Sequence, residues 1–418
     1  MGYLDLFCLG SRPRIRLASV DGHAGLEFHG RSSAVSARNP FSAVKILWVT
    51  NWYPSAEAPF RSPFIRAQWL AARSAGVDAD LLHIDILKGP IVPKIGWSRG
   101  PHGEYILRLE WRWWKWIYHN PWVTAWYLSR TYAGPKPDLI HGQVLLPAGL
   151  TAAYLAKHWN RVLVHTEHWN LAPDRLRSGF WGFFGRRAMG MAKLVLPVSE
   201  HLATDLSSVL PGTPMKVVPN VMDWSRFHYR AAPTLPRASK FRVLSVAHLI
   251  PLNKHIKITE WTLEALGILQ KRHPEVAWQY VHVGGGPRQR ELEDLALSIG
   301  LSAQWLGNQE PGAWSEVEAD VLVHPTLDET FGMVVYEALH RGLPVLASDI
   351  PAFSSWLRPP LGLLVAEGPE AFADALEQFW MNPFAVPQDG FDFKRFEAQE
   401  VGNQLQKIYA GLLPQDGF

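Results

Sequence analysis

Two glutamates with seven residues between them, Glu329 and Glu337, have a spacing that suggests chemistry. Glu329 follows an expected strand at residues 320–324, and Glu337 lies one turn into a helix expected at residues 332–341. Backbone N–H groups at the start of a helix have no partner within it and can bind a phosphate. Here those groups belong to Phe331, Gly332 and Met333.

Carboxylates placed in this way can hold the two halves of a sugar nucleotide. Glu337 can accept hydrogen bonds from a ribose diol, and Glu329 can accept them from sugar hydroxyls. Hydrogen bonds to charged groups contribute about 1.5–3 kcal/mol each. The spacing alone fits equally well two solvated glutamates beside an ordinary helix cap. The Phe331-Gly332 pair and the Gly342-Leu-Pro-Val345 segment around the glutamates favour a nucleotide-sugar site.

Further short segments precede this stretch in the chain. They are Pro137-Asp-Leu-Ile-His141, Thr166-Glu-His168, Val198-Ser199, Pro219-Asn-Val-Met-Asp223 with Phe227, the run from Ser245 to Lys254, and Gly284-Gly-Gly-Pro287. In series with residues 328–345, they resemble the retaining glycosyltransferases of family four, which carry an EX7E motif and have the GT-B fold. The resemblance covers roughly residues 45–412.

The resemblance implies a role for each matching residue. Lys254 would bind the donor diphosphate, Glu329 would face the donor sugar, and His168 would approach that sugar from the amino-terminal domain; these three would be the catalytic residues. The implied donor-binding residues are His248, Glu337, Phe331, Gly332, Met333, Gly284, Gly285 and, from the loop at residues 55–62, Arg61. The family also implies retention of configuration, no metal and no cofactor beyond the nucleotide-diphosphate sugar donor.

The sequence departs from the family pattern at several positions. His248 stands six positions before Lys254, where the family usually has an arginine with its permanent charge and bidentate geometry. Val221 and His255 replace glycines. A catalytically decayed nucleotide-sugar-binding protein is therefore one alternative, and a nucleotide-sugar epimerase of the same fold is another. Without the series of motifs, Lys254 could equally be an exposed loop lysine and His168 a histidine of the core.

The elements that must position these residues alternate along the chain. Short apolar runs begin at Lys45 and recur between helical segments, which is typical of parallel sheets covered on both faces. We expect two Rossmann-like, doubly wound α/β domains facing across a cleft, at residues 44–228 and 241–390, with a linker at 229–240. A strand is also expected at residues 215–218. Residues 1–43 should form a flexible extension, and 391–418 a helix that packs back on the amino-terminal domain.

Composition excludes several classes of protein. The 418 residues carry a formal charge of only +3, too little for a nucleic-acid binder. The single cysteine, Cys8, cannot form an intrachain disulfide and fits a reducing, cytoplasmic compartment. No phosphate loop of the GxxxxGK[ST] type and no zinc spacing occurs. The Asp78-Ala-Asp80 segment resembles a metal-binding Asp-x-Asp, but a turn before a strand explains it better.

A tryptophan cluster at residues 108–118 allows two interpretations. Trp111, Trp113, Trp114 and Trp116 lie among Arg108, Arg112 and Lys115, and they show neither strand alternation nor a helical stripe. In one interpretation they form a hairpin and helix that cover the core, or a cleft wall that stacks on acceptor sugars. In the other they make a peripheral contact with the inner face of the cytoplasmic membrane, where a lipid-linked acceptor would be reached. The acceptor is expected to be a glycan or a lipid-linked glycan.

Overall fold

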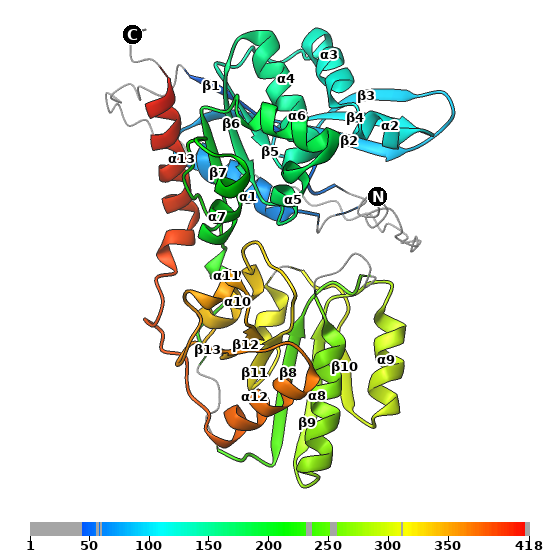
Figure 1. The fold of residues 1–418 in the computed structure, drawn as a ribbon, viewed down its shortest axis with the longest axis vertical. Coiled ribbons are helices and arrows are strands. Elements are labelled where there is room, and N and C mark those ends of the chain that lie inside the picture. Colours follow the sequence, from blue (N-terminus) through cyan, green and yellow to red (C-terminus); the bar gives the residue numbers. More distant parts are fainter. Residues whose placement is uncertain are drawn as a thin grey trace, which may run out of the picture.

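The computed structural model describes residues 44–55, 58, 61–230, 236–250, 257–310 and 312–413. These residues form two α/β domains, one above the other in Figure 1. The expectation of two doubly wound domains is therefore confirmed. No helix within the described ranges is long and apolar enough to span a bilayer.

The amino-terminal domain is built on a seven-stranded sheet in the order β3-β4-β2-β1-β5-β6-β7. All neighbouring strands are parallel except β3, which pairs antiparallel with β4. The strands are β1 (Lys45–Thr50), β2 (Asp78–Lys88), β3 (Lys94–Arg99), β4 (Tyr105–Trp111), β5 (Leu139–Gln143), β6 (Val162–Glu167) and β7 (Leu194–Pro197). The strands β1, β5, β6 and β7 are almost wholly buried because helices cover both faces of the sheet.

The helices of this domain connect the strands. They are α1 (Pro63–Ser74), α2 (Trp114–Tyr118), α3 (Pro121–Thr131), α4 (Leu150–Trp159), α5 (Ala172–Arg177), α6 (Gly179–Met189) and α7 (Glu200–Val209). A π-helical turn at Leu145–Gly149 leads into α4, and a 3-10 turn at Trp224–Arg226 leaves the domain. Ser199 caps α7 by accepting a hydrogen bond from the Leu202 amide, as is usual at a helix start.

The carboxyl-terminal domain has a six-stranded parallel sheet in the order β10-β9-β8-β11-β12-β13. Its strands are β8 (Lys240–Val246), β9 (Ala277–Val283), β10 (Ser302–Trp305), β11 (Val321–His324), β12 (Val345–Ser348) and β13 (Gly362–Val365). Its helices are α8 (Thr259–Arg272), α9 (Gln289–Ser298), α10 (Met333–His340), α11 (Pro351–Ser354) and α12 (Pro369–Met381), with a 3-10 turn at Ala313–Glu316. Trp278, Tyr280 and Phe372 are buried in its core.

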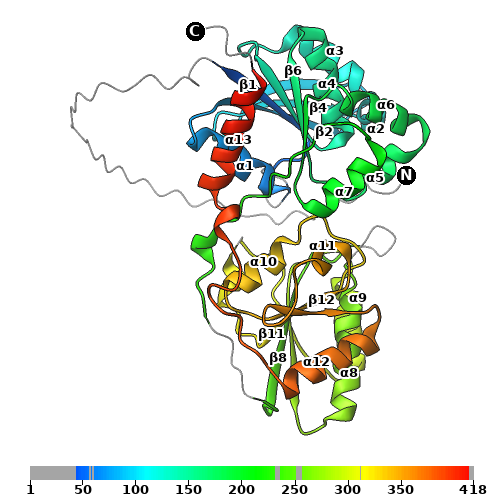
Figure 2. The same ribbon diagram turned by 60° about the vertical axis from the view of Figure 1, so that its left-hand side comes forward.

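The last part of the chain returns to the amino-terminal domain. After a 3-10 turn at Lys394–Phe396, helix α13 (Ala398–Leu412) packs along α1, as Figure 2 shows. Gly402 lies against the Ala71 carbonyl, and its missing side chain lets the two helices approach closely. The Tyr409 hydroxyl lies 2.7 Å from His141 Nδ1, in the middle of β5.

Two stretches differ from what the sequence suggested. Residues 215–218 form only an isolated bridge at Met215 with Val195, because prolines at 214 and 219 confine the segment. The tryptophan cluster lies at the end of β4 and in the short helix α2. The hairpin and helix of the first interpretation are present. Trp113 and Trp116 are nevertheless exposed and do not cover the core.

Candidate functional site

Glu329 lies in the loop between β11 and α10, where the sequence suggested. Its carboxylate accepts a hydrogen bond from Lys257 Nζ, which also lies 3.1 Å from His324 Nε2. Burial opposes ionisation of Glu329, but the charge of Lys257 and the hydrogen bond from His324 hold its pKa well below its usual range. Burial and, to a lesser extent, the charge of Lys257 lower the pKa of His324 to about 4. Glu329 is therefore an ionised, half-buried acceptor next to a neutral histidine.

Gly332 makes the turn that starts α10. Its φ of 77° is in the left-handed region, and a Cβ there would lie 2.6 Å from the Phe353 ring. Both facts select glycine. No side chain caps the first amides of α10, and Gly332 places this helix start three residues after Glu329.

Glu337 lies one turn into α10. Burial raises the pKa of Glu337 to about 7, and a hydrogen bond with Trp314 opposes this shift. Near neutral pH the carboxyl group is thus divided between its neutral and ionised forms. Such a group can accept hydrogen bonds from a diol most effectively after it has lost its proton.

The glycine turn after β9 lies against the loop that follows β8. A Cβ on Gly284 or Gly286 would collide with the carbonyls of Ala247 or Leu249, and the Leu249 amide donates to the Gly285 carbonyl over 3.1 Å. These glycines therefore hold residues 247–249 in place by close backbone contact.

His248 lies in that supported loop, with an exposed side chain. Desolvation by the neighbouring atoms lowers the pKa of its imidazole, and a backbone hydrogen bond with Gly285 opposes the shift. His248 is therefore mostly neutral at pH 7, unlike the arginine it replaces.

His168 follows β6 in the other domain and is buried. Its Nε2 lies 2.9 Å from Gln143 Oε1 and its Nδ1 lies 3.2 Å from Asn220 Oδ1. Burial lowers its pKa to about 3, so the ring is neutral. A neutral imidazole carries one N–H and can donate to only one of these two oxygens, which holds the ring within the amino-terminal domain.

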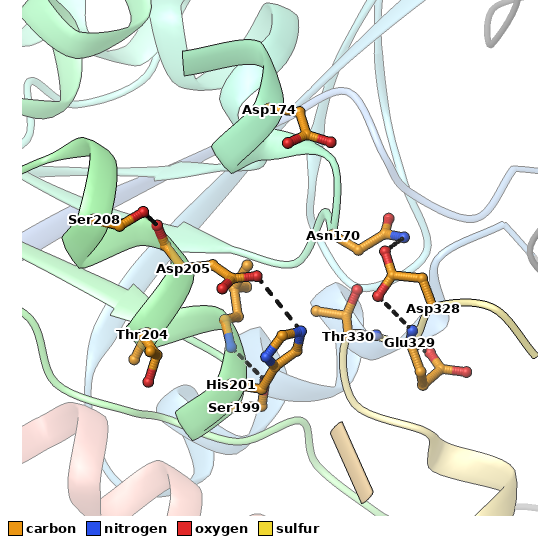
Figure 3. A network of polar contacts seen from close by, with 12 residues as sticks. Asn170, Asp174, Ser199, His201, Thr204, Asp205, Ser208, Asp328, Glu329 and Thr330 are labelled. Atoms are coloured by element: carbon orange, nitrogen blue, oxygen red, sulfur yellow. Dashed lines mark hydrogen bonds and ion pairs between the residues drawn. The ribbon is translucent and has the colours of Figure 1, made fainter. Parts of the chain in front are cut away.

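A hydrogen bond joins the two domains beside Glu329. Asn170 Nδ2, two residues after His168, donates to Asp328 Oδ2 over 2.8 Å, and Asp328 Oδ1 accepts from the Glu329 amide over 2.7 Å. Figure 3 shows Asn170 pointing at Asp328, with Glu329 and Thr330 on the same loop. The loops that follow β6 and β11 therefore meet here.

The other sequence-predicted positions have different outcomes. Lys254 lies outside the described residues. The charge of Arg61 acts on His83 and Tyr118, both in the amino-terminal domain. Asp78 and Asp80 both pair with Lys45. Among the described residues, no group of three or more histidine, cysteine, aspartate and glutamate side chains is arranged to hold a metal ion.

Sequence reasoning missed Lys257, His324, Asp328 and Asn170. Lys257 lies 72 residues before its partner Glu329, and Asn170 lies 158 residues before Asp328. No local pattern reports such pairs. The one available signal was the position of Asp328 directly before Glu329.

Comparisons with known proteins identify the family. A sequence model described as glycosyl transferases group 1 matches residues 240–382, and one described as glycosyltransferase family 4 matches residues 96–226. The D-inositol 3-phosphate glycosyltransferase of Corynebacterium urealyticum is 30% identical over 325 residues, which are 68% of this chain and 74% of that protein. The chain belongs to glycosyltransferase family 4. The resemblance found in the motifs is confirmed.

Longer but more distant matches agree. TuaC of Bacillus subtilis, named for teichuronic acid biosynthesis, is 26% identical to this glycosyltransferase over 88% of the chain and 97% of TuaC. Sucrose-phosphate synthase from Thermosynechococcus elongatus superposes with a TM-score of 0.64 at 18% identity, over 88% of this chain and 98% of the synthase. Anabaena HepE, solved with UDP and glucose, superposes with a TM-score of 0.61 at 17% identity, over 88% of this chain and 100% of HepE. These structures confirm the predicted GT-B fold.

Proposed function

We propose that this glycosyltransferase moves a sugar from a nucleotide-diphosphate sugar to a glycan or lipid-linked acceptor, with retention of configuration and without a metal. The observation that carries the proposal is the unit of Glu329, Gly332 and Glu337 at the start of α10. It combines an ionised carboxylate, free helix amides and a second carboxyl one turn away. The structures of Anabaena HepE in complex with UDP and glucose and with UDP-glucose support this donor class.

The chemistry we propose is a front-face displacement. The acceptor hydroxyl oxygen bonds to the anomeric carbon on the face from which the diphosphate leaves, and the bond between that carbon and the phosphate oxygen breaks. The departing diphosphate takes the hydroxyl proton. The first amides of α10, Lys254 and the protonated form of His248 would stabilise the developing negative charge, which is usually the largest catalytic contribution. Glu329 would orient the donor sugar through its hydroxyls.

The biological setting we propose is the synthesis of cell-surface polysaccharide or glycolipid at the inner face of the cytoplasmic membrane. Support comes from the relatives, which include TuaC, named for teichuronic acid biosynthesis. The cluster of Trp111, Trp113, Trp114 and Trp116 provides a second support, because tryptophan favours the bilayer interface.

Site variants test the reaction. Replacing Lys254 by alanine, or Glu329 by glutamine, should lower kcat/KM by at least about tenfold, a loss of about 1.4 kcal/mol or more of transition-state stabilisation. Lys271→Ala is the matched control, because Lys271 is an exposed lysine at the end of α8. Full activity in both site variants, with any donor that the wild type uses, would refute the assignment.

A further inference from the structure

One side of the amino-terminal domain exposes an unusual set of aromatic rings. Trp113, Trp116, Trp126, Phe180 and Phe183 each have between 51% and 58% of their surface exposed. They come from the segment before α2 and from α2, α3 and α6. By contrast, Leu297 and Leu327 are the only large apolar side chains exposed in the described part of the carboxyl-terminal domain. We call the surface formed by these five aromatic residues the aromatic face.

The rings of the aromatic face lie on helices that contact one another. Trp122 of α3 lies 6.4 Å from the Trp181 ring and 6.5 Å from the Phe180 ring, both on α6. His119, at the end of α2, lies 5.5 Å from the same Trp181 ring. Figure 1 shows α2, α3 and α6 on one side of the domain. The partly buried rings thus support a second layer of rings that contact solvent.

The β3–β4 hairpin extends this surface. Every residue of β3 is exposed, and Ile91 and Val92, just before it, are 60% and 75% exposed. The Trp111 indole donates to the Ile91 carbonyl over 2.8 Å, and the Trp111 ring lies 5.2 Å from that of Trp113. The hairpin is thereby connected to the aromatic face.

Charge in this region is strongly one-sided. Residues 86–193 contain fifteen lysines and arginines against five aspartates and glutamates, a surplus of ten, although the whole chain carries only +3. Arg112, Lys115, Arg130 and Arg187 are exposed on the same helices and connections. The Arg130 guanidinium lies 4.3 Å from the Trp126 ring, so cation and aromatic ring share one surface.

We propose that the aromatic face, with the β3–β4 hairpin, docks on the surface of an anionic lipid bilayer. A tryptophan ring is wide and apolar with one polar edge, and it is most stable at the level of the lipid headgroups. Basic side chains around such rings gain about 1 kcal/mol each near an anionic leaflet. A contact with a second copy of this chain would instead bring two like-charged surfaces together.

The aromatic face lies close in sequence to the end of β6, where His168 is found. Phe180 follows His168 by about twelve residues, through α5 alone, so the bilayer would lie beside the carboxyl end of β6. The inference that the acceptor is presented at a membrane surface rests on the proposed function. Binding to the bilayer itself does not depend on turnover.

The test is co-sedimentation with vesicles. The wild type should pellet with vesicles of 30% phosphatidylglycerol in phosphatidylcholine at low salt, remain in solution with phosphatidylcholine alone, and be released from the anionic vesicles by added salt. The variant Trp113→Ser/Trp116→Ser/Phe183→Ser should bind at least about tenfold more weakly. Arg112→Gln/Lys115→Gln should weaken binding by roughly fivefold for each charge removed. Leu297→Ser, which removes a still more exposed apolar side chain from α9, should bind as the wild type does.

Three results would overturn the proposal. They are wild type that stays in solution with anionic vesicles, aromatic variants that pellet equally well, and a wild-type dimer that the aromatic variant converts to a monomer. Circular dichroism melting shows whether each variant is folded, and the two-charge variant provides an independent check if the aromatic one is not. Donor binding measured without vesicles separates the two claims: vesicle binding without donor binding would refute the proposed function and leave the docking surface intact.

Discussion

Glu329 depends on Lys257 for its charge, although Lys257 matches no motif. If Lys257 is replaced by methionine, only His324 still offsets the burial of Glu329, and the pKa of Glu329 should rise. The acid limb of the kcat/KM profile should then move to higher pH, and kcat/KM at pH 7 should fall by at least about tenfold. Lys271→Met should leave both unchanged. A Lys257→Met enzyme with the wild-type acid limb would show that the ion pair has no role in the reaction.

Glu337 predicts a pH dependence of donor binding. In the free protein its pKa is about 7, and hydrogen bonds from a ribose would favour the ionised form and lower the pKa in the complex. Donor affinity should therefore fall as pH decreases through 7, by up to about tenfold between pH 8 and pH 6. Calorimetric titration of the wild type and of Glu337→Gln measures this effect, and the variant should lose it.

His248 would act in the opposite direction. Only its protonated form pairs with the diphosphate, so its contribution should decrease as pH rises, and its lowered pKa confines that contribution to acidic pH in the free protein. In Glu337→Gln the remaining pH dependence should therefore be the one that His248 causes. A rise in affinity with pH that persists in Glu337→Gln would exclude Glu337 as its source.

Among the elements, α13 offers a matched pair of glycines. Gly402 faces the Ala71 carbonyl of α1 so closely that a Cβ must displace one helix, whereas nothing lies within 4 Å of a Cβ at Gly411 on the same helix. Gly402→Ala should lower the free energy of unfolding by about 1–3 kcal/mol, as other overpacking changes do. Gly411→Ala should be neutral or stabilising by up to about 1 kcal/mol, because alanine favours helix. Urea unfolding measures both, and equal effects would refute the close packing of α13 on α1.

At the scale of the whole molecule, the bond between Asn170 and Asp328 couples the two domains. Asn170→Ala should favour more open arrangements, so its radius of gyration in small-angle scattering should increase in the absence of donor. KM for the donor should rise more than kcat falls, because closing the domains would then cost binding energy. Asp174→Asn is the control: Asp174 appears above the same network in Figure 3, but it forms only an exposed pair with Arg177. An unchanged radius and KM in Asn170→Ala would show that the bond does not control closure.

The sequence predicted the fold and the strand and helix on either side of Glu329, because short-range patterns of residues determine both. The strand before Glu329 and the helix start at Gly332 needed only apolar runs and a glycine, and both are present. The contacts that set the charge and position of these residues are different. Lys257 meets Glu329 only when the carboxyl-terminal domain has folded, and Asn170 meets Asp328 only when both domains have. Such pairs leave no periodic signal.

The central claim is glycosyl transfer, and product analysis tests it most directly. The wild type and Glu329→Gln would be incubated with UDP- and GDP-sugars and with lipid-linked glycans extracted from bacterial membranes, and the products followed by NMR and mass spectrometry. The wild type should release one nucleoside diphosphate for each new glycosidic bond, and that bond should have the anomeric configuration of the donor. Glu329→Gln should do so far more slowly. Isomerised sugar nucleotide without a new bond, or donor binding with no turnover, would contradict the account.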